Sequence, residues 1–155
     1  MGFAALSVKG RALRYLAQRE HSRAELERKL ARSVRDSETA SAQAQIALAL
    51  DQLAAAGLLS DARAADAVLS SQGRKFGTRR LKQVLLSKGL DAELVGTTLQ
   101  QARVTELDRA REVWRRRFGA PATDAAERAK QMRFLAGRGF DGEIIRRVVR
   151  GSDED

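Results

Sequence analysis

The sequence contains no cysteine, which excludes disulfides and thiolate metal sites. It has one proline, and aromatic residues make up 5% of its 155 positions, so little in it favours a β-sheet. No stretch approaches the roughly 18 apolar residues of a membrane span, and the N-terminus lacks the apolar run of a secretory signal. These absences predict an all-α, soluble, cytoplasmic protein that does not enter a membrane.

Residues suited to catalysis are also scarce. The chain has one histidine, His21, and no cluster of histidines and acids at metal-ligand spacing. Segment 73–78 has two glycines, but it lacks the glycine spacing of a phosphate-binding loop and the lysine that follows the second glycine in such a loop. The end of one helix and the start of the next explain this segment better. Two pairs of acids lie at predicted helix starts, where capping accounts for them, namely Asp91 with Glu93 and Asp141 with Glu143. We therefore expect no enzymatic activity, no cofactor and no metal.

Alanine and leucine dominate the 43% of residues that are hydrophobic, and both favour helices. Helical spacing of apolar side chains, bounded by capping residues, predicts nine helices. The first begins near Ser7, and the second begins at a capping box of Ser22 and Glu25, with Leu26 and Leu30 facing inward. The other predicted helices cover about 39–56, 61–73, 78–88, 91–103, 105–118, 125–137 and 142–149.

The helices repeat in groups of three. Residues 89–95 match residues 139–145 at an offset of 50, and two of the preceding segments end in Phe76-Gly77 and Phe118-Gly119. Units of 40 to 50 residues bury little core alone, so they are expected to stack into an elongated body. The predicted units are residues 7–57, 60–104 and 105–150, followed by a flexible acidic tail over 151–155.

The segment 73–95 has the clearest helix boundaries. Gly77 is predicted to end one helix in a left-handed cap, Thr78 to cap the next helix, and Gly89 to end that one. The inward side of this middle helix is predicted to be Leu81, Val84 and Leu85.

Positive charge is the strongest functional signal. Lysine and arginine number 29 against 20 acids, a net charge of +9, and residues 73–90 hold six bases and no acid. An ordinary salt-bridged surface interleaves both signs, so these bases favour contact with a polyanion. No base-reading motif accompanies them, so nucleic-acid contacts should be to phosphates, and Trp114 is spaced as a core residue. The predicted contact residues are Arg74, Lys75, Arg79, Arg80, Lys82 and Lys88, then Arg115, Arg116 and Arg117, and then Lys130, Arg133 and Arg138.

Four short motifs follow one another along residues 9–149. They are Arg19-Glu-His-Ser22 with Glu25, Leu26, Lys29 and Leu30; Gly57-Leu-Leu-Ser-Asp61; Gly77 with Arg80, Leu81, Leu85, Lys88 and Gly89; and Phe134-Leu135 with Arg138, Gly139 and Phe140. Each motif alone is weak, whereas their order and spacing together are specific. The chain thereby resembles the RecX family, bacterial regulators of the RecA recombinase. It departs from the family at Ala64, where a large aromatic residue is usual.

The resemblance implies three tandem three-helix units in a curved body without enzymatic activity. It implies binding to RecA and to RecA filaments on single-stranded DNA, within the filament groove. The expected consequences are slower filament growth and less ATP hydrolysis, strand exchange and co-protease activity in recombinational DNA repair and the SOS response. We expect a monomer that also contacts single- and double-stranded DNA through phosphates.

Two other interpretations stay open at this point. One is a nonspecific DNA-binding architectural protein that acts without RecA, with affinity that falls steeply with salt. The other is a helical-repeat adaptor whose acidic partner is another protein. Titration with bare DNA at two salt concentrations separates these two.

Overall fold

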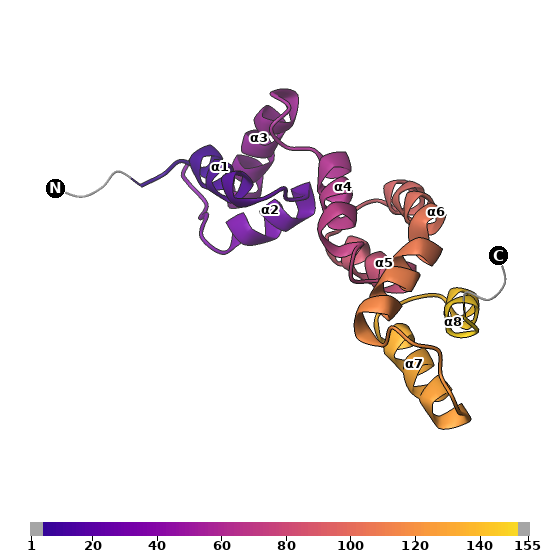
Figure 1. Ribbon diagram of the computed structural model, residues 1–155. Helices are drawn as coiled ribbons and strands as arrows, with labels where there is room; N and C mark the ends of the chain where they lie inside the picture. Colours follow the sequence, from indigo (N-terminus) through magenta and orange to yellow (C-terminus); the bar gives the residue numbers. More distant parts are fainter. Residues whose placement is uncertain (1–4, 152–155) are drawn as a thin grey trace. The chain divides into compact units, whose positions relative to one another are not determined.

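The computed structural model describes residues 5–151, which form helices and no strand, and this confirms the all-α fold class (Figure 1). Residues 152–155 of the predicted acidic tail and the first four residues lie outside the described part. No helix within residues 5–151 is long and apolar enough to cross a membrane. The helices are α1 (Val8–Gln18), α2 (Arg23–Ala31), α3 (Ala42–Ala55), α4 (Asp61–Gln72), α5 (Thr78–Ser87), α6 (Ala92–Arg117), α7 (Ala125–Gly137) and α8 (Gly142–Val149).

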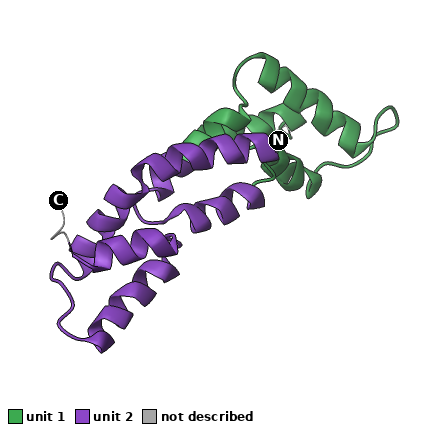
Figure 2. Ribbon diagram, turned by 90° about the vertical axis from the view of Figure 1, so that its right-hand side faces the viewer, with its two compact units in different colours: residues 1–67, 88–90 green, residues 68–87, 91–155 purple. Residues whose placement is uncertain are grey.

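The chain forms two compact units, coloured separately in Figure 2. Unit 1 comprises residues up to 67 together with 88–90, and unit 2 comprises residues 68–87 and those from 91 onward. The division into three repeats predicted from the sequence stays a prediction.

In unit 1, helices α1, α2 and α3 pack on one another around a small leucine-rich core. The predicted capping box opens α2, because the Ser22 hydroxyl accepts from the Glu25 amide and the Glu25 carboxylate accepts from the Ser22 amide. The predicted inward residues of α2, Leu26 and Leu30, are buried, which confirms its helical face. Helix α3 buries Ile46, Leu50 and Leu53. The core residues are Ala12, Leu26, Leu30, Val34, Ile46, Leu50, Leu53 and Leu59.

In unit 2, α5 packs on α6, and α6, α7 and α8 pack on one another. Leu81 and Leu85 of α5 are fully buried, as their predicted inward face requires. Trp114 of α6 packs against the second cluster, and its indole N–H donates to the Gln131 side chain at 2.9 Å, so its predicted core role is confirmed. That cluster consists of Ala110, Val113, Leu135, Phe140, Ile145, Val148 and Val149.

The predicted helices 91–103 and 105–118 are wrong as separate elements, because α6 runs without a break from Ala92 to Arg117. Buried residues recur every three or four positions through the expected boundary, at Leu99, Ala102, Glu106 and Ala110. No proline or capping glycine interrupts this stripe, and Val104 is 84% exposed and packs against nothing that could bend the chain. The helix therefore continues, and the described part of the chain has eight helices instead of nine.

The predicted roles of Gly77 and Thr78 are also wrong. Gly77 is absent from the glycines with positive φ, which include Gly57, Gly89 and Gly139, so it makes no left-handed cap. Its lack of a side chain instead lets its backbone approach Phe140, since a Cβ there would lie 2.4 Å from the Phe140 Cα. The amide of Thr78 is capped from a distance by the carboxylate of Glu106, at 3.1 Å.

Candidate functional site

His21 has a structural role in unit 1. Its ring is fully buried, Nδ1–H donates to the Arg19 carbonyl at 3.0 Å, and Nε2 accepts from the Lys29 ammonium at 2.8 Å. These partners fix the neutral tautomer and leave neither ring nitrogen free for a substrate. Among the described residues no group of histidines and acids is placed to hold a metal ion.

The environment of His21 yields a pH prediction. Burial lowers the pKa of His21 from 6.5, with help from the charges of Arg19 and Lys29, and this outweighs the hydrogen bond to the Arg19 carbonyl. As the pH falls below 6.5, the unfolded chain binds a proton at His21 more readily than the folded chain does. The free energy of unfolding therefore declines toward acid pH. We expect the imidazole resonance of this single histidine to titrate with a midpoint below 6.5 in an NMR titration. A midpoint at or above 6.5 would contradict this.

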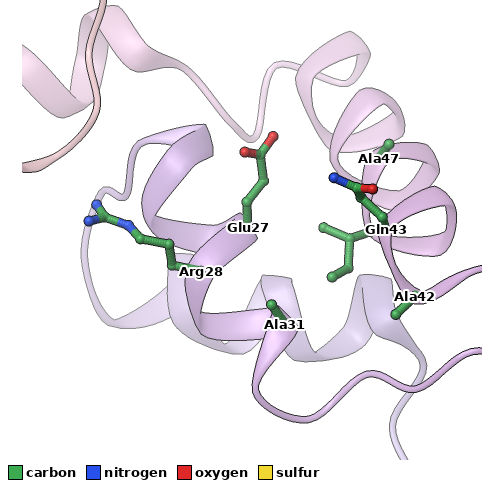
Figure 3. A pocket seen from close by; sticks show the side chains of 7 residues that line it. Glu27, Arg28, Ala31, Ala42, Gln43 and Ala47 are labelled. Atoms are coloured by element: carbon green, nitrogen blue, oxygen red, sulfur yellow. The ribbon is translucent and has the colours of Figure 1, made fainter.

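A groove of about 570 Å³ lies between α2 and α3 of unit 1 (Figure 3). Glu27 and Gln43 extend from the two helices on either side of it, and Figure 3 labels three alanines along the same helices, Ala31, Ala42 and Ala47. The lining suits an apolar side chain of a partner better than proton transfer or metal binding. The lining residues are Glu27, Arg28, Ala31, Ala42, Gln43, Ile46 and Ala47.

The first predicted basic group is split by the structure. Five of its members, Arg74, Lys75, Arg79, Arg80 and Lys82, are exposed on unit 2 at the end of α4 and along α5. Arg79 forms an exposed ion pair with Asp141 at 3.4 Å. The capping role predicted for Asp141 is wrong, because its side chain makes no capping hydrogen bond at the start of α8.

Lys88, the sixth member of that group, belongs to unit 1 and faces inward. Its side chain is 18% exposed, and its ammonium lies 3.2 Å from the carboxylate of Glu25. The sequence spacing could not reveal this pairing, because the two residues are 63 positions apart. Lys88 is therefore held in place as a structural cation.

The second and third basic groups lie in unit 2. Arg115 and Arg116 are exposed near the end of α6, and each forms an ion pair with Glu112. Lys130 and Arg133 are exposed on α7. The two remaining arginines, Arg117 and Arg138, contact aromatic rings instead of acids.

These ring contacts bring together one member of each basic group. The guanidinium groups of Arg80 and Arg138 lie 4.8 and 5.8 Å from the ring centre of Phe76. Those of Arg138 and Arg117 lie 5.2 and 5.5 Å from the ring centre of Phe134. All four distances fall within the roughly 6 Å reach of cation–π attraction. We call this chain of contacts, Arg80, Phe76, Arg138, Phe134 and Arg117, the Arg–Phe ladder.

Sequence reasoning gave Phe76 only as part of a repeated Phe-Gly pair and assigned Phe134 no role beyond a motif. The available signal was that each phenylalanine follows a basic residue, Lys75 before Phe76 and Arg133 before Phe134. Arg109 was also missed, although its guanidinium donates to the carbonyls of Gly73, Phe76 and Ala102 at 2.8, 2.6 and 2.7 Å. It ties the turn that carries Phe76 to α6.

Comparison with known proteins gives consistent matches. Residues 9–41 match the family model of the first three-helix domain of RecX, and residues 105–149 match that of the third. The Regulatory protein RecX of Leptothrix cholodnii is 51% identical over 150 residues, which cover 97% of this chain and 92% of the relative. That of Ralstonia nicotianae is 43% identical over 148 residues, which cover 96% and 89%.

Two solved structures share the fold. The crystal structure of RecX from Lactobacillus salivarius aligns with a TM-score of 0.73 and 21% identity, covering 92% of each chain. A crystal structure of a regulatory protein RecX aligns with a TM-score of 0.71 and 18% identity, covering 93% of this chain and 72% of the other.

Proposed function

The chain belongs to the RecX family of regulatory proteins, and from this we propose that it is a negative regulator of the RecA recombinase. The observation that carries the proposal is 51% identity to a regulatory protein RecX across nearly the whole length of both chains. In this proposal the protein acts in the cytoplasm as a monomer and by binding, without catalysis. It engages RecA and RecA filaments on single-stranded DNA, in the filament groove.

Binding in the groove would slow filament growth and reduce ATP hydrolysis, strand exchange and co-protease activity during recombinational repair and the SOS response. The exposed bases of unit 2 support this proposal, because several weak contacts on adjoining filament subunits add through effective concentration. We assign the central contact face to Arg74, Lys75, Arg79, Arg80 and Lys82, extended by Arg115, Arg116, Lys130 and Arg133.

The direct test follows ATP hydrolysis by RecA on preformed single-strand filaments while the protein is titrated in. Inhibition with much less protein than RecA indicates action at filament ends, whereas inhibition near one protein per few RecA subunits indicates groove occupancy. No inhibition, together with salt-sensitive binding to bare DNA, would instead indicate an architectural DNA-binding protein. Neither inhibition nor DNA binding would indicate an adaptor for an acidic protein.

Reversing the charge of Arg79, Arg80 and Lys82 to glutamate is expected to weaken inhibition of RecA at least tenfold while the fold is kept. These side chains are exposed, and the buried Leu81 and Leu85 of the same helix are untouched. The Arg79 ion pair is too exposed to contribute much stability. Dose–response curves of ATP hydrolysis and circular dichroism measure the two effects.

The matched control reverses Lys9, Arg14 and Arg32, three exposed bases of unit 1 outside the proposed face, with the same change in net charge. We expect this control to inhibit RecA as the unaltered chain does. Equal loss in both triple variants would mean that net charge, and not this face, determines binding.

A further inference from the structure

The Arg–Phe ladder is held in place by the backbone on which its members lie. The Gly77 amide donates to the Arg138 carbonyl and the Arg79 amide donates to the Gly139 carbonyl, both at 2.9 Å. The turn before α5 and the turn after α7 are therefore joined directly. A Cβ at Gly139 would lie 2.4 Å from the Cβ of Arg80, so these backbones could not approach so closely with larger residues. Phe76 and its two arginines are thus fixed relative to one another.

The three ladder arginines differ from their neighbours in having no acid. Arg79, Arg115 and Arg116 each form an ion pair. Within residues 5–151, by contrast, the guanidinium groups of the ladder have neither a hydrogen-bond acceptor nor a carboxylate partner. Their N–H donors are therefore free for an external anion. A guanidinium group offers a planar fork of donors that matches two oxygens of a phosphate.

Helix dipoles favour two of the three ladder arginines and disfavour the third. Arg117 ends α6 and Arg138 follows α7, where the negative helix end favours a cation. Arg80 lies in the first turn of α5, at the positive end, where a cation is unfavourable. The helix dipole therefore does not account for Arg80, whereas its contact with the Phe76 ring and an external row of negative charges both favour a cation there.

We propose that the Arg–Phe ladder is a prearranged binding row for successive phosphates of single-stranded nucleic acid. In it Arg80, Arg138 and Arg117 contact phosphate oxygens, and Phe76 and Phe134 are positioning residues that hold them. Three free guanidinium groups with no intervening acid fit a polymer that repeats its charge better than a protein surface of mixed sign. Arg80 and Arg117 are exposed, and arginine can also stack on the unstacked bases of a single strand. This inference rests on the proposed function; it names what Arg80 of the central contact face contacts and adds Arg117 and Arg138 to that contact.

The test measures binding of the full chain to a labelled oligothymidylate in the absence of RecA, over a series of salt concentrations. The ladder triple variant is Arg80→Gln, Arg117→Gln and Arg138→Gln, and its matched control is Arg79→Gln, Arg115→Gln and Arg116→Gln. Both lose the same charge from unit 2. Each phosphate contact contributes about 0.7 to the slope of log affinity against log salt on single strands, so the ladder triple should lower the slope by about 2. The control should lower it by less than half as much.

A second variant isolates the rings. Phe76→Leu with Phe134→Leu keeps apolar bulk and all charge, so the slope should stay while affinity falls roughly tenfold, because the arginines must be ordered on binding. Thermal unfolding checks that all three variant proteins fold.

Three results would overturn the proposal. They are equal slope changes in the two triple variants, no measurable binding of the unaltered chain to the oligonucleotide, or displacement of the oligonucleotide by polyglutamate as efficient as by unlabelled strand. The last would indicate an acidic protein partner. Weaker binding to a duplex of equal length is expected, and equal binding would contradict the preference for a single strand.

ATP hydrolysis by RecA separates this inference from the proposed function. A ladder triple that loses oligonucleotide binding but still inhibits RecA would confirm the ladder and place the RecA contact elsewhere. Loss of binding by the ladder triple, with no inhibition of RecA even by the unaltered chain, would confirm the ladder and refute the proposed function.

Discussion

Replacing Gly77 with alanine is expected to lower the free energy of unfolding by about 3 kcal/mol or more, near the upper end of overpacking effects. The new Cβ would lie 2.4 Å from both the N and the Cα of Phe140 and 2.5 Å from the Gly139 carbonyl oxygen. All three are backbone atoms, so no side-chain rotation relieves the clash. Relief requires the two turns to separate, which breaks the hydrogen bond from the Gly77 amide to the Arg138 carbonyl. Chemical denaturation monitored by circular dichroism measures the loss.

Gly96→Ala provides a control with the same chemical change. Gly96 lies inside α6 and is exposed, and a Cβ added there would have no neighbour within 4 Å outside its own stretch of helix. Alanine favours a helix interior over glycine by about 0.8–1.0 kcal/mol, so this variant should gain stability. Opposite signs for the two variants are therefore expected. A Gly77→Ala variant as stable as the unaltered chain would refute the direct packing of these turns.

The Gly77 variant also bears on the ladder. Separating the turns moves Phe76 away from Arg138, because the broken hydrogen bond joins Arg138 to the residue that follows Phe76. Single-strand affinity should fall in the Gly77→Ala variant even under conditions where it stays folded, and it should be unchanged in Gly96→Ala. Loss of both stability and single-strand affinity in the Gly77→Ala variant would indicate that the packing of these two turns positions the ladder.

Local features of this chain could be predicted from sequence because their partners lie within a few residues. The capping box of Ser22 and Glu25 spans three positions, and the caps at Asp91 and Asp124 likewise bind amides three residues on. The buried faces of α2, α3 and α5 followed from helical periodicity alone. The residues in each of these contacts lie within one helix length of each other in the sequence. The local spacing of residue types is therefore enough to predict them.

Contacts over long sequence separations could not be predicted in this way. In the sequence Glu106 is one acid on a helix, yet its buried carboxylate accepts from the amides of both Thr78 and Asp141, at 3.1 and 3.3 Å. A capping residue 28 positions away leaves no local pattern. The same reason explains the error at Gly77, whose partner is Phe140.

The candidate site divides in the same way. Charge density correctly placed exposed bases along residues 74–82, because an acid-free run must face solvent or a partner. It could not distinguish Arg79, which has Asp141, from Arg80, which has a ring. That distinction depends on which residue of a distant turn lies beside each guanidinium group.

Replacing Glu25 with glutamine is expected to lower the free energy of unfolding by about 3 kcal/mol. This is in the range found when one partner of a buried ion pair is removed. The Glu25 side chain is 9% exposed and its carboxylate accepts from Arg19 at 2.7 Å and Lys88 at 3.2 Å. Glutamine keeps the shape and can still accept from the Ser22 amide. It removes the charge that balances Lys88, whose side chain is 18% exposed and would be left without a carboxylate partner.

This variant should also alter the response to acid. Burial alone raises the pKa of Glu25, but hydrogen bonds from Arg19 and the Ser22 amide and the charges of Lys88 and Arg19 outweigh it and lower the pKa from 4.5 to about 2. Since the folded pKa lies below the unfolded one, the contribution is fully present above pH 4.5 and is lost as the pH falls toward 2. Stability of the unaltered chain should therefore decline in that window, and that of Glu25→Gln should decline less.

Glu27→Gln is the matched control for this experiment, two residues along the same helix. Glu27 is 50% exposed and pairs with Arg23 at 3.1 Å within α2, an arrangement worth only a few tenths of a kcal/mol. It should change neither the stability nor its acid dependence appreciably. Parallel pH curves for the unaltered chain and Glu25→Gln would contradict the assigned pairing.

The loss of stability due to His21 begins below pH 6.5 and that due to Glu25 begins below pH 4.5, so the two contributions separate along one curve of stability against pH. Glu25 thus holds Lys88 beside the start of α2, which explains why a basic residue in an otherwise exposed run faces inward.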